Sequence, residues 1–228
     1  YTLFVSSYSP SYNGSFALPF DFYSTGSVIF GEYTGRSPID LARANYGSSE
    51  LGITIDPTFV GGTLHMDQAN AVYTGDFTLA NIASSTIDQN DQFSRFDGVF
   101  SDGAAGKPGY ITIDNSGTDG AVIFAGTNTY TGSTTLKGGT LVVSDDVNLG
   151  DTAATLVLDG GTLLTTEGFN SSRDLTLEST GTINVTSEKV LNLDGVASGA
   201  GSWTQAGEGS IVLSADSTFT GSTTVAEG

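Results

Sequence analysis

The amino-acid sequence predicts an all-β protein, and specifically a right-handed parallel β-helix. Three observations lead to this prediction: short apolar runs end in Gly, Asp or Asn, such runs recur about every 20 residues, and one seven-residue motif occurs twice. Gly supplies 31 of the 228 residues and Pro only 5, as expected for short strands joined by tight turns. A β-sandwich is the main alternative, but it predicts neither a constant period nor an internal repeat.

Residues 1–50 differ from the rest of the chain, because they are dense in aromatic side chains and lack the repeated motif. We expect them to form an irregular β-rich cap, or leading turns with decorated loops. The segment 37–45 (SPIDLARAN) is the best helix candidate, since Ser37 can cap it and Pro38 suits its first position. Tyrosine joins an apolar ring to a polar tip, which favours contact surfaces. The predicted contact residues of this region are Tyr8, Tyr12, Tyr33 and Tyr46.

From residue 51 the pattern is regular, and we predict that 51–228 form the β-helix, most clearly 96–228. Apolar triplets recur in two interleaved series with a period near 20 residues. Two such series predict turns of two or three short strands, stacked in parallel about 4.8 Å apart. At that period the whole chain would make roughly 11 turns. The first series starts at Leu141, Leu163 and Ile183, and the second at Leu156, Leu175, Leu191 and Ile211.

The motif T-[YF]-T-G-S-T-T occurs at 129–135 and again at 218–224. Each copy follows a shorter element, FDGV at 96–99 and LDGV at 193–196. A segment that recurs with its aromatic, its glycine and its hydroxyl run in place indicates a structural repeat. We expect the two aromatic residues to pack against the next coil. The structural members of this repeat are Tyr130, Gly132, Phe219 and Gly221.

The charge and the cysteine count exclude several classes of partner. Acidic residues number 25 and basic residues 7, so the net charge is −18. A nucleic-acid partner is not expected, because there is no basic footprint. Charge-driven binding to an anionic membrane is equally unexpected. Cys is absent, which excludes disulfide staples and thiolate metal sites.

His65 is the only histidine, and a Ser–His–Asp triad would require it. It alternates with Leu64 and Met66, with Asp56 and Asp67 nearby, and the chain has no G-x-S-x-G elbow. We therefore interpret His65 as an outward-facing strand residue. The basic residues are scattered, so no acid–base cluster for glycoside chemistry is visible either. The sequence predicts no catalytic residue and no cofactor.

The segment 145–151 (DDVNLGD) partly resembles a calcium loop, but it lacks the bidentate Glu that normally ends one. The alternative is a turn in which Asp and Asn bond their own backbone and Gly150 supplies the bend. We favour the turn and predict no metal site.

A succession of segments carries a resemblance to a known family: 127–144 (TNTYTGSTTLKGGTLVVS), 146–151, 156–165 (LVLDGGTLLT), 171–177 (SSRDLTL), 181–185 and 193–203. In this order they resemble the autotransporter-associated β-strand repeat of Gram-negative type V secreted passenger domains. The resemblance covers 96–228 well, and 61–80 and 85–88 more loosely. One departure is Gln205, where the family usually has Lys.

The resemblance implies a β-helical passenger on the bacterial surface, exported through a C-terminal β-barrel translocator. Three functions are compatible with it. The first is an adhesion or self-association scaffold that makes non-catalytic contacts with a surface protein, a glycan or an identical copy. The second is a passive stalk for a protease or esterase elsewhere in the chain, and the third is a polysaccharide-active enzyme. The chain begins at Tyr1 rather than Met, so we expect it to be part of a longer protein.

Overall fold

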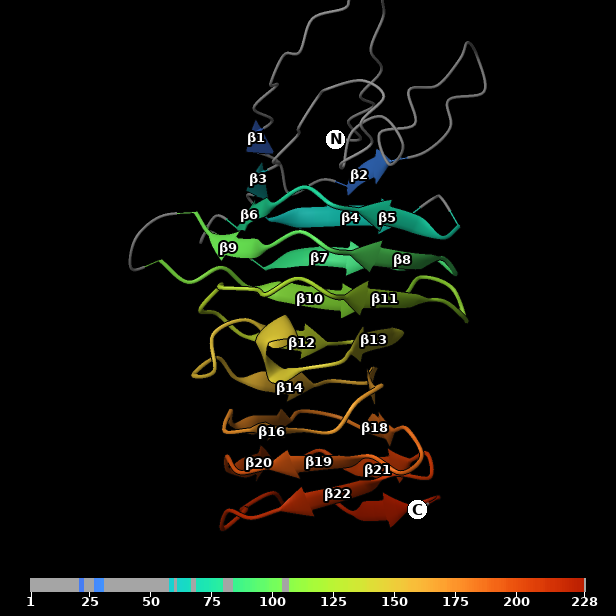
Figure 1. Cartoon of the computed structure of the whole chain (residues 1–228), viewed down its shortest axis with the longest axis vertical. Helices are drawn as coiled ribbons and strands as arrows, with labels where there is room; N and C mark the ends of the chain where they lie inside the picture. Colours follow the sequence, from blue (N-terminus) through green and yellow to red (C-terminus); the bar gives the residue numbers. More distant parts are fainter. Residues whose placement is uncertain are drawn as a thin grey trace, which may run out of the picture.

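The computed structural model describes residues 21–22, 27–30, 58–59, 61–66, 69–79, 84–103 and 107–227. Every strand pair in these residues is parallel, and the strands stack into a β-solenoid of about seven turns (Figure 1). This arrangement confirms the predicted parallel β-helix over the β-sandwich. The helix expected at 37–45 lies outside the described residues. In the described part no helix is long and apolar enough to span a membrane.

Two eight-stranded sheets run along the whole described solenoid. We name them sheets I and II. Sheet I contains β2 (Ser27–Phe30), β4 (Gly62–Met66), β7 (Ser85–Asp88), β10 (Ile111–Asp114), β12 (Thr134–Leu136), β14 (Leu156–Leu158), β17 (Leu175–Leu177) and β20 (Ala197–Gly199). Sheet II contains β5 (Ala71–Tyr73), β8 (Phe93–Phe96), β11 (Ala121–Phe124), β13 (Thr140–Val143), β15 (Thr162–Thr165), β18 (Gly181–Val185), β21 (Trp203–Ala206) and β23 (Thr223–Val225).

The third side of the solenoid is interrupted. Sheet III occupies its first turns, and sheet IV its last turns. Between them the chain passes through 125–132 and the 3₁₀ helix η1 (Asp146–Leu149), which are joined by the bond from Asn128 N to the carbonyl of Val147. Sheet III contains β1 (Asp21–Phe22), β3 (Thr58–Phe59), β6 (Phe77–Leu79) and β9 (Phe100–Asp102), and sheet IV contains β16 (Phe169–Ser171), β19 (Val190–Leu193) and β22 (Ser210–Leu213).

The strand register supports the first apolar series and corrects the second. Leu141 pairs with Leu163, and Leu163 with Ile183, all in sheet II. In the second series Leu156 and Leu175 pair in sheet I, whereas Leu191 and Ile211 pair in sheet IV. The true partner of Leu175 is Ala197. The predicted series moved from sheet I to sheet IV after Leu175. The reason is that β20 of sheet I carries small residues, whereas β19 of sheet IV carries the next aliphatic triplet.

The length of a turn also changes along the chain. In sheet II, Ser94 pairs with Val122, 28 residues later, whereas Leu163 pairs with Ile183, 20 residues later. The uniform period near 20, and the estimate of roughly 11 turns based on it, are therefore wrong for the first half. Longer loops such as 115–120 extend the early turns without adding a strand.

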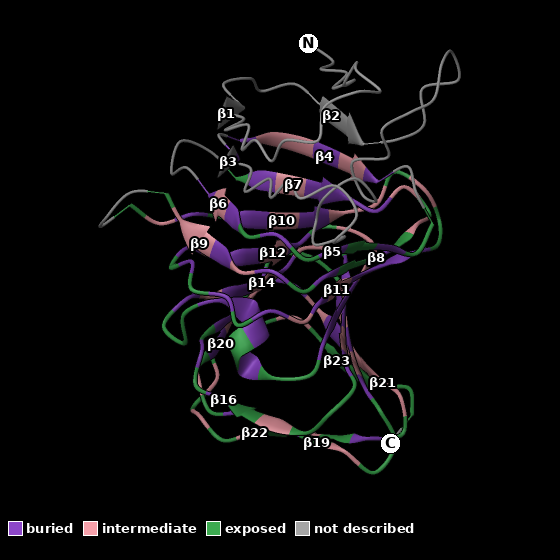
Figure 2. Ribbon diagram, turned by 45° about the horizontal axis from the view of Figure 1, so that its top comes forward, coloured by how far each residue is buried: buried purple, intermediate pink, exposed green. Residues whose placement is uncertain are grey.

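Buried residues are found along the strands of every side of the solenoid (Figure 2). The kind of side chain that fills the core changes along the solenoid. In the early turns Phe59, Phe77, Phe100 and Phe124 stack in sequence, with ring centroids 5.5, 4.8 and 4.9 Å apart. In the later turns leucine, isoleucine and valine fill the same interior. Stacked turns therefore bury like side chains above like, which is how a repeat array forms a continuous core.

The glycine of the FDGV element allows two turns to approach closely. A Cβ built on Gly98 would lie 1.9 Å from the carbonyl oxygen of Gly75 in the preceding turn. Likewise a Cβ on Gly126 would lie 2.2 Å from the carbonyl oxygen of Gly98. Only glycine fits a backbone contact this close, which accounts for Asp-Gly before β9.

The two copies of the repeat do not lie on the same side of the solenoid. The first copy ends in β12 of sheet I, and the second ends in β23 of sheet II. The FDGV and LDGV elements that precede the two copies are offset in the same way, because Gly98 precedes β9 of sheet III whereas Gly195 precedes β20 of sheet I. The spacing of 89 residues, from Thr129 to Thr218, corresponds to four turns and one further side.

Candidate functional site

The predicted contact tyrosines Tyr8, Tyr12, Tyr33 and Tyr46 all lie outside the described residues. That contact surface stays a prediction. The remaining candidates are the repeat residues, the 145–151 segment, His65 and the outer faces of the sheets.

Tyr130 of the first repeat lies in the core with no exposed surface. Its hydroxyl is hydrogen-bonded to Thr134 Oγ1 at 2.5 Å. Burial raises the pKa of Tyr130 to about 12, although the bond to Thr134 and the charge of Arg173 act in the opposite direction. A Cβ on Gly150, which has φ +85°, would lie 2.8 Å from the Tyr130 ring, so the ring packs on the backbone of the next turn. Phe219 at the same motif position is partly buried against the core.

The glycines of the repeat approach the preceding turn. A Cβ on Gly132 would lie 2.3 Å from the carbonyl oxygen of Gly109, and one on Gly221 would lie 2.0 Å from that of Gly201. Both positions thus place backbone against backbone. The pattern matches the Asp-Gly contact described for Gly98.

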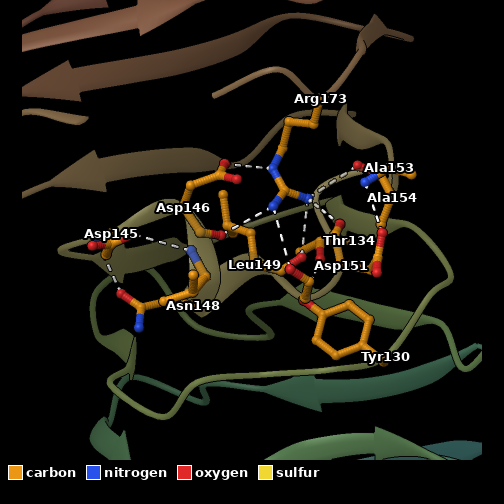
Figure 3. A network of polar contacts seen from close by, with 12 residues as sticks. Tyr130, Thr134, Asp145, Asp146, Asn148, Leu149, Asp151, Ala153, Ala154 and Arg173 are labelled. Atoms are coloured by element: carbon orange, nitrogen blue, oxygen red, sulfur yellow. Dashed lines mark hydrogen bonds and ion pairs between the residues drawn. The ribbon is translucent and has the colours of Figure 1, made fainter. Parts of the chain in front are cut away.

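The 145–151 segment uses its polar side chains internally. Asp145 caps η1 by accepting a hydrogen bond from Val147 N, and Asn148 Oδ1 accepts from the backbone N of Ser144 and Asp145. Asp146 is buried and paired with Arg173 (Figure 3). These oxygens are therefore engaged by protein donors. Among the described residues no group of three or more metal-ligating side chains gathers here or elsewhere.

Arg173 is the centre of this network, and sequence reasoning treated it only as one of the scattered basic residues. Its Nε donates to Asp146 Oδ1 at 2.8 Å. Its Nη1 and Nη2 atoms donate to the backbone carbonyls of Asp146, Leu149, Gly150, Asp151 and Ala154. The side chain is 2 % exposed. Arg173 thus satisfies the carbonyls left free where the third side has no strand.

His65 in β4 lies beside Asp88 in β7, and its Nδ1 is 2.7 Å from Asp88 Oδ2. Among the described residues no serine hydroxyl is hydrogen-bonded to this histidine. Asp56 and Asp67, which sequence reasoning placed near it, lie outside the described residues. Asp88 Oδ1 also accepts from the backbone N of Asn90 and Ser116. Burial would raise the pKa of Asp88, but the hydrogen bonds from Ser116, His65 and Asn90 outweigh it and lower that pKa.

Replacing Asp88 by asparagine is expected to lower the free energy of unfolding by about 1 kcal/mol near neutral pH. Because the folded-state pKa of Asp88 is lowered, its contribution is complete above the unfolded-state pKa and is lost as pH falls through the folded-state value. The difference between wild type and variant should therefore shrink below about pH 4. Denaturant titrations from pH 7 to pH 2 measure it, with Asp159→Asn controlling for the loss of one charge. A difference that is independent of pH would contradict the expectation.

Two long columns of threonine run along the outer faces. On sheet I the strand register aligns Thr63, Thr86, Thr112 and Thr135, with Thr176 further along. On sheet II it aligns Thr140, Thr162, Thr182, Thr204 and Thr224. Neighbouring members of a column are about 4.8 Å apart, as parallel strands are, except that Val157 separates Thr135 from Thr176 on sheet I. Stacked turns thus present hydroxyl groups at a constant spacing.

Comparison with known proteins agrees with this repeat architecture. The family model of the passenger-associated-transport-repeat matches residues 116–143 and 203–228, which contain the two copies of the motif. A relative, the adhesin BmaC autotransporter of Brucella suis biovar 1 (strain 1330), is 32% identical over 216 residues. The chain carries the repeat of autotransporter passenger domains. No solved structure matches it.

The match to the Brucella autotransporter covers 94% of this chain but only 6% of that protein. The chain therefore spans a small part of its relative's length. Passenger domains of this class are surface-exposed or secreted at the outer membrane of Gram-negative bacteria, and the predicted location is confirmed. Each family match spans about one full turn, and the motif within it ends on a different side of the solenoid, in β12 of sheet I and in β23 of sheet II.

Proposed function

We propose that this passenger segment is an adhesive scaffold that makes non-catalytic contacts along the outside of the solenoid. The observation that carries the proposal is the pair of in-register threonine columns on sheets I and II. They repeat one polar group at a constant spacing, so many weak contacts can act together. The partner would be a surface protein, a glycan or an identical copy.

The relative supports this proposal, because its name describes an adhesin. In the same proposal, a C-terminal β-barrel translocator carries the passenger to the surface. A non-enzymatic role agrees with the use of the polar side chains around η1 and Asp88 in internal hydrogen bonds. The four tyrosines of 1–50 are a second proposed contact region.

Surface display tests the proposed function. The chain is fused to a heterologous translocator in a non-adherent bacterium, and attachment to epithelial cells and to immobilised matrix proteins and glycans is counted. We expect attachment to rise about tenfold over cells that display the translocator alone, as multivalent contacts would produce. A display strain whose attachment equals that control would contradict the scaffold and favour the passive stalk. New reducing or unsaturated ends in a glycan panel would instead indicate the enzyme.

A further inference from the structure

The outer face of sheet II is uncharged over most of its length. In β11, β13, β15, β18, β21 and β23 no residue is ionisable. Beside the threonine column of this sheet runs an aliphatic column, in which Ile123, Val142 and Leu164 are in register; Ile123 and Leu164 are partly exposed, and Val142 between them is buried. Towards the first turns Arg95 takes the next position of this column and Val72 the one after it, with Phe93 beside them; Val72 and Phe93 are 43% and 47% exposed.

Arg95 is the only charged residue in the described strands of sheet II, and its Nε is paired with Asp97 Oδ1 at 2.5 Å. This face is unusual in a chain with a net charge of −18. The threonine column of sheet I, by contrast, is bordered by ionisable side chains two residues further along the chain, at or near the end of each strand or directly after it. They are His65, Asp88, Asp114, Lys137, Asp159 and Glu178.

We propose that the outer face of sheet II is a contact surface for a second copy of this chain. The inference rests on the proposed scaffold function and names its partner. Two chains of charge −18 repel each other through their acidic surfaces, whereas the strands of this face carry no carboxylate. The nearest exposed acids after these strands, Asp145, Glu167, Glu208 and Glu227, lie two residues beyond the strand ends, at the edge of the face. An uncharged, partly apolar face of this kind is typical of an interaction site.

The period of the surface also fits a second copy. Both copies have the same strand spacing of about 4.8 Å. If the side chains of one copy fit between those of the other at one turn, they therefore fit at every turn along the face. Face-to-face packing of two sheets about 10 Å apart is an established arrangement for such surfaces. A ligand without this period would match at one turn and lose the match at the next.

The expected contact is weak for one pair of chains. Six strands of about four residues each cover roughly 380 Å² per copy, and roughly 760 Å² for two. Stable interfaces bury about 1,600 Å² in total. The contact therefore needs multivalency, as on a surface that carries many copies.

Bead clustering tests the proposal. Streptavidin beads carry the chain, biotinylated through a C-terminal tag, and the clustered fraction is measured by microscopy. Beads with the wild-type chain are expected to cluster. For beads with the sheet II variant Thr162→Glu/Thr204→Glu, the clustered fraction should be at least about fivefold lower than for wild type, because carboxylates then oppose each other. The matched control, Val190→Glu/Val212→Glu, adds the same charge at two exposed positions of sheet IV, outside both threonine columns, and should cluster as wild type does.

A second variant keeps the test independent of folding. Thr162→Lys/Thr204→Lys beads should cluster with the Glu-bearing sheet II beads, but neither type should cluster alone. Wild-type beads that stay dispersed, or sheet IV and sheet II variants that respond alike, would overturn the proposal. So would clustering that requires an added glycan or protein, since that ligand would be the partner. Attachment of displaying cells to host surfaces is measured separately, so that the scaffold function can stand if self-contact fails.

Discussion

Replacing Arg173 by methionine is expected to lower the free energy of unfolding by about 3–5 kcal/mol. The variant leaves the Asp146 carboxylate buried without its partner. It also removes the donors for five backbone carbonyls around η1. An unpaired buried charge costs more than the removed pair stabilises, so the loss should be large. Denaturant unfolding followed by far-ultraviolet circular dichroism measures it.

Arg95→Met is the matched control, because it removes an arginine–aspartate pair of similar geometry from the surface. The Arg95 side chain is 48 % exposed, and exposed pairs contribute about 0–1 kcal/mol. Asp146→Leu combined with Arg173→Met should recover part of the loss, since the unpaired charge is then absent. Equal losses for Arg173→Met and Arg95→Met would show that the buried network does not stabilise the solenoid.

Tyr130→Ala is expected to destabilise the chain by about 3–5 kcal/mol, because it empties a fully buried aromatic site. Tyr130→Phe keeps the ring and leaves the Thr134 hydroxyl without its partner, at a cost of about 1 kcal/mol. Phe219→Ala changes the same motif position at a partly buried site, so its loss should be smaller. Denaturant midpoints of the three variants measure the order.

An equal loss for Tyr130→Ala and Phe219→Ala would contradict the role of burial in this order. A small loss for both would contradict the proposal that the repeated aromatics are coil-packing residues. Tyr130→Phe separates the ring from the hydroxyl, so a loss equal to that of Tyr130→Ala would assign the effect to the hydrogen bond instead.

The period of the aliphatic residues predicted the fold, because stacked parallel strands place like residues above like. Leu141, Leu163 and Ile183 follow one column of sheet II, as their spacing indicates. The column of sheet I was misassigned after Leu175, because its next member is Ala197 and a small residue leaves no apolar signal. Loop insertions of variable length hid the early turns for a similar reason, since they change the spacing but not the stacking.

Arg173 could not be assigned from the sequence. Its partners lie 19 to 27 residues earlier, one turn below, and none forms a motif with it along the chain. Its role depends on a missing strand on the third side, which leaves carbonyls to be satisfied. The segment 145–151 offered a local signal for a turn, but the need for a buried guanidinium appears only once the turns are stacked. The contact tyrosines remain predictions for a different reason, since 1–50 is almost entirely outside the described residues.

The offset of one side between the two repeat copies determines the direction in which each copy faces around the long axis. Thr129 and Thr218 begin the same motif, yet the second copy is turned by about a third of a revolution around the long axis. A third copy at the same 89-residue spacing would occupy the remaining side, and a fourth would return to the first after 13 turns, or about 62 Å. Such a spacing distributes the motif in all radial directions, so the motif itself would mark no preferred side of such a fibre.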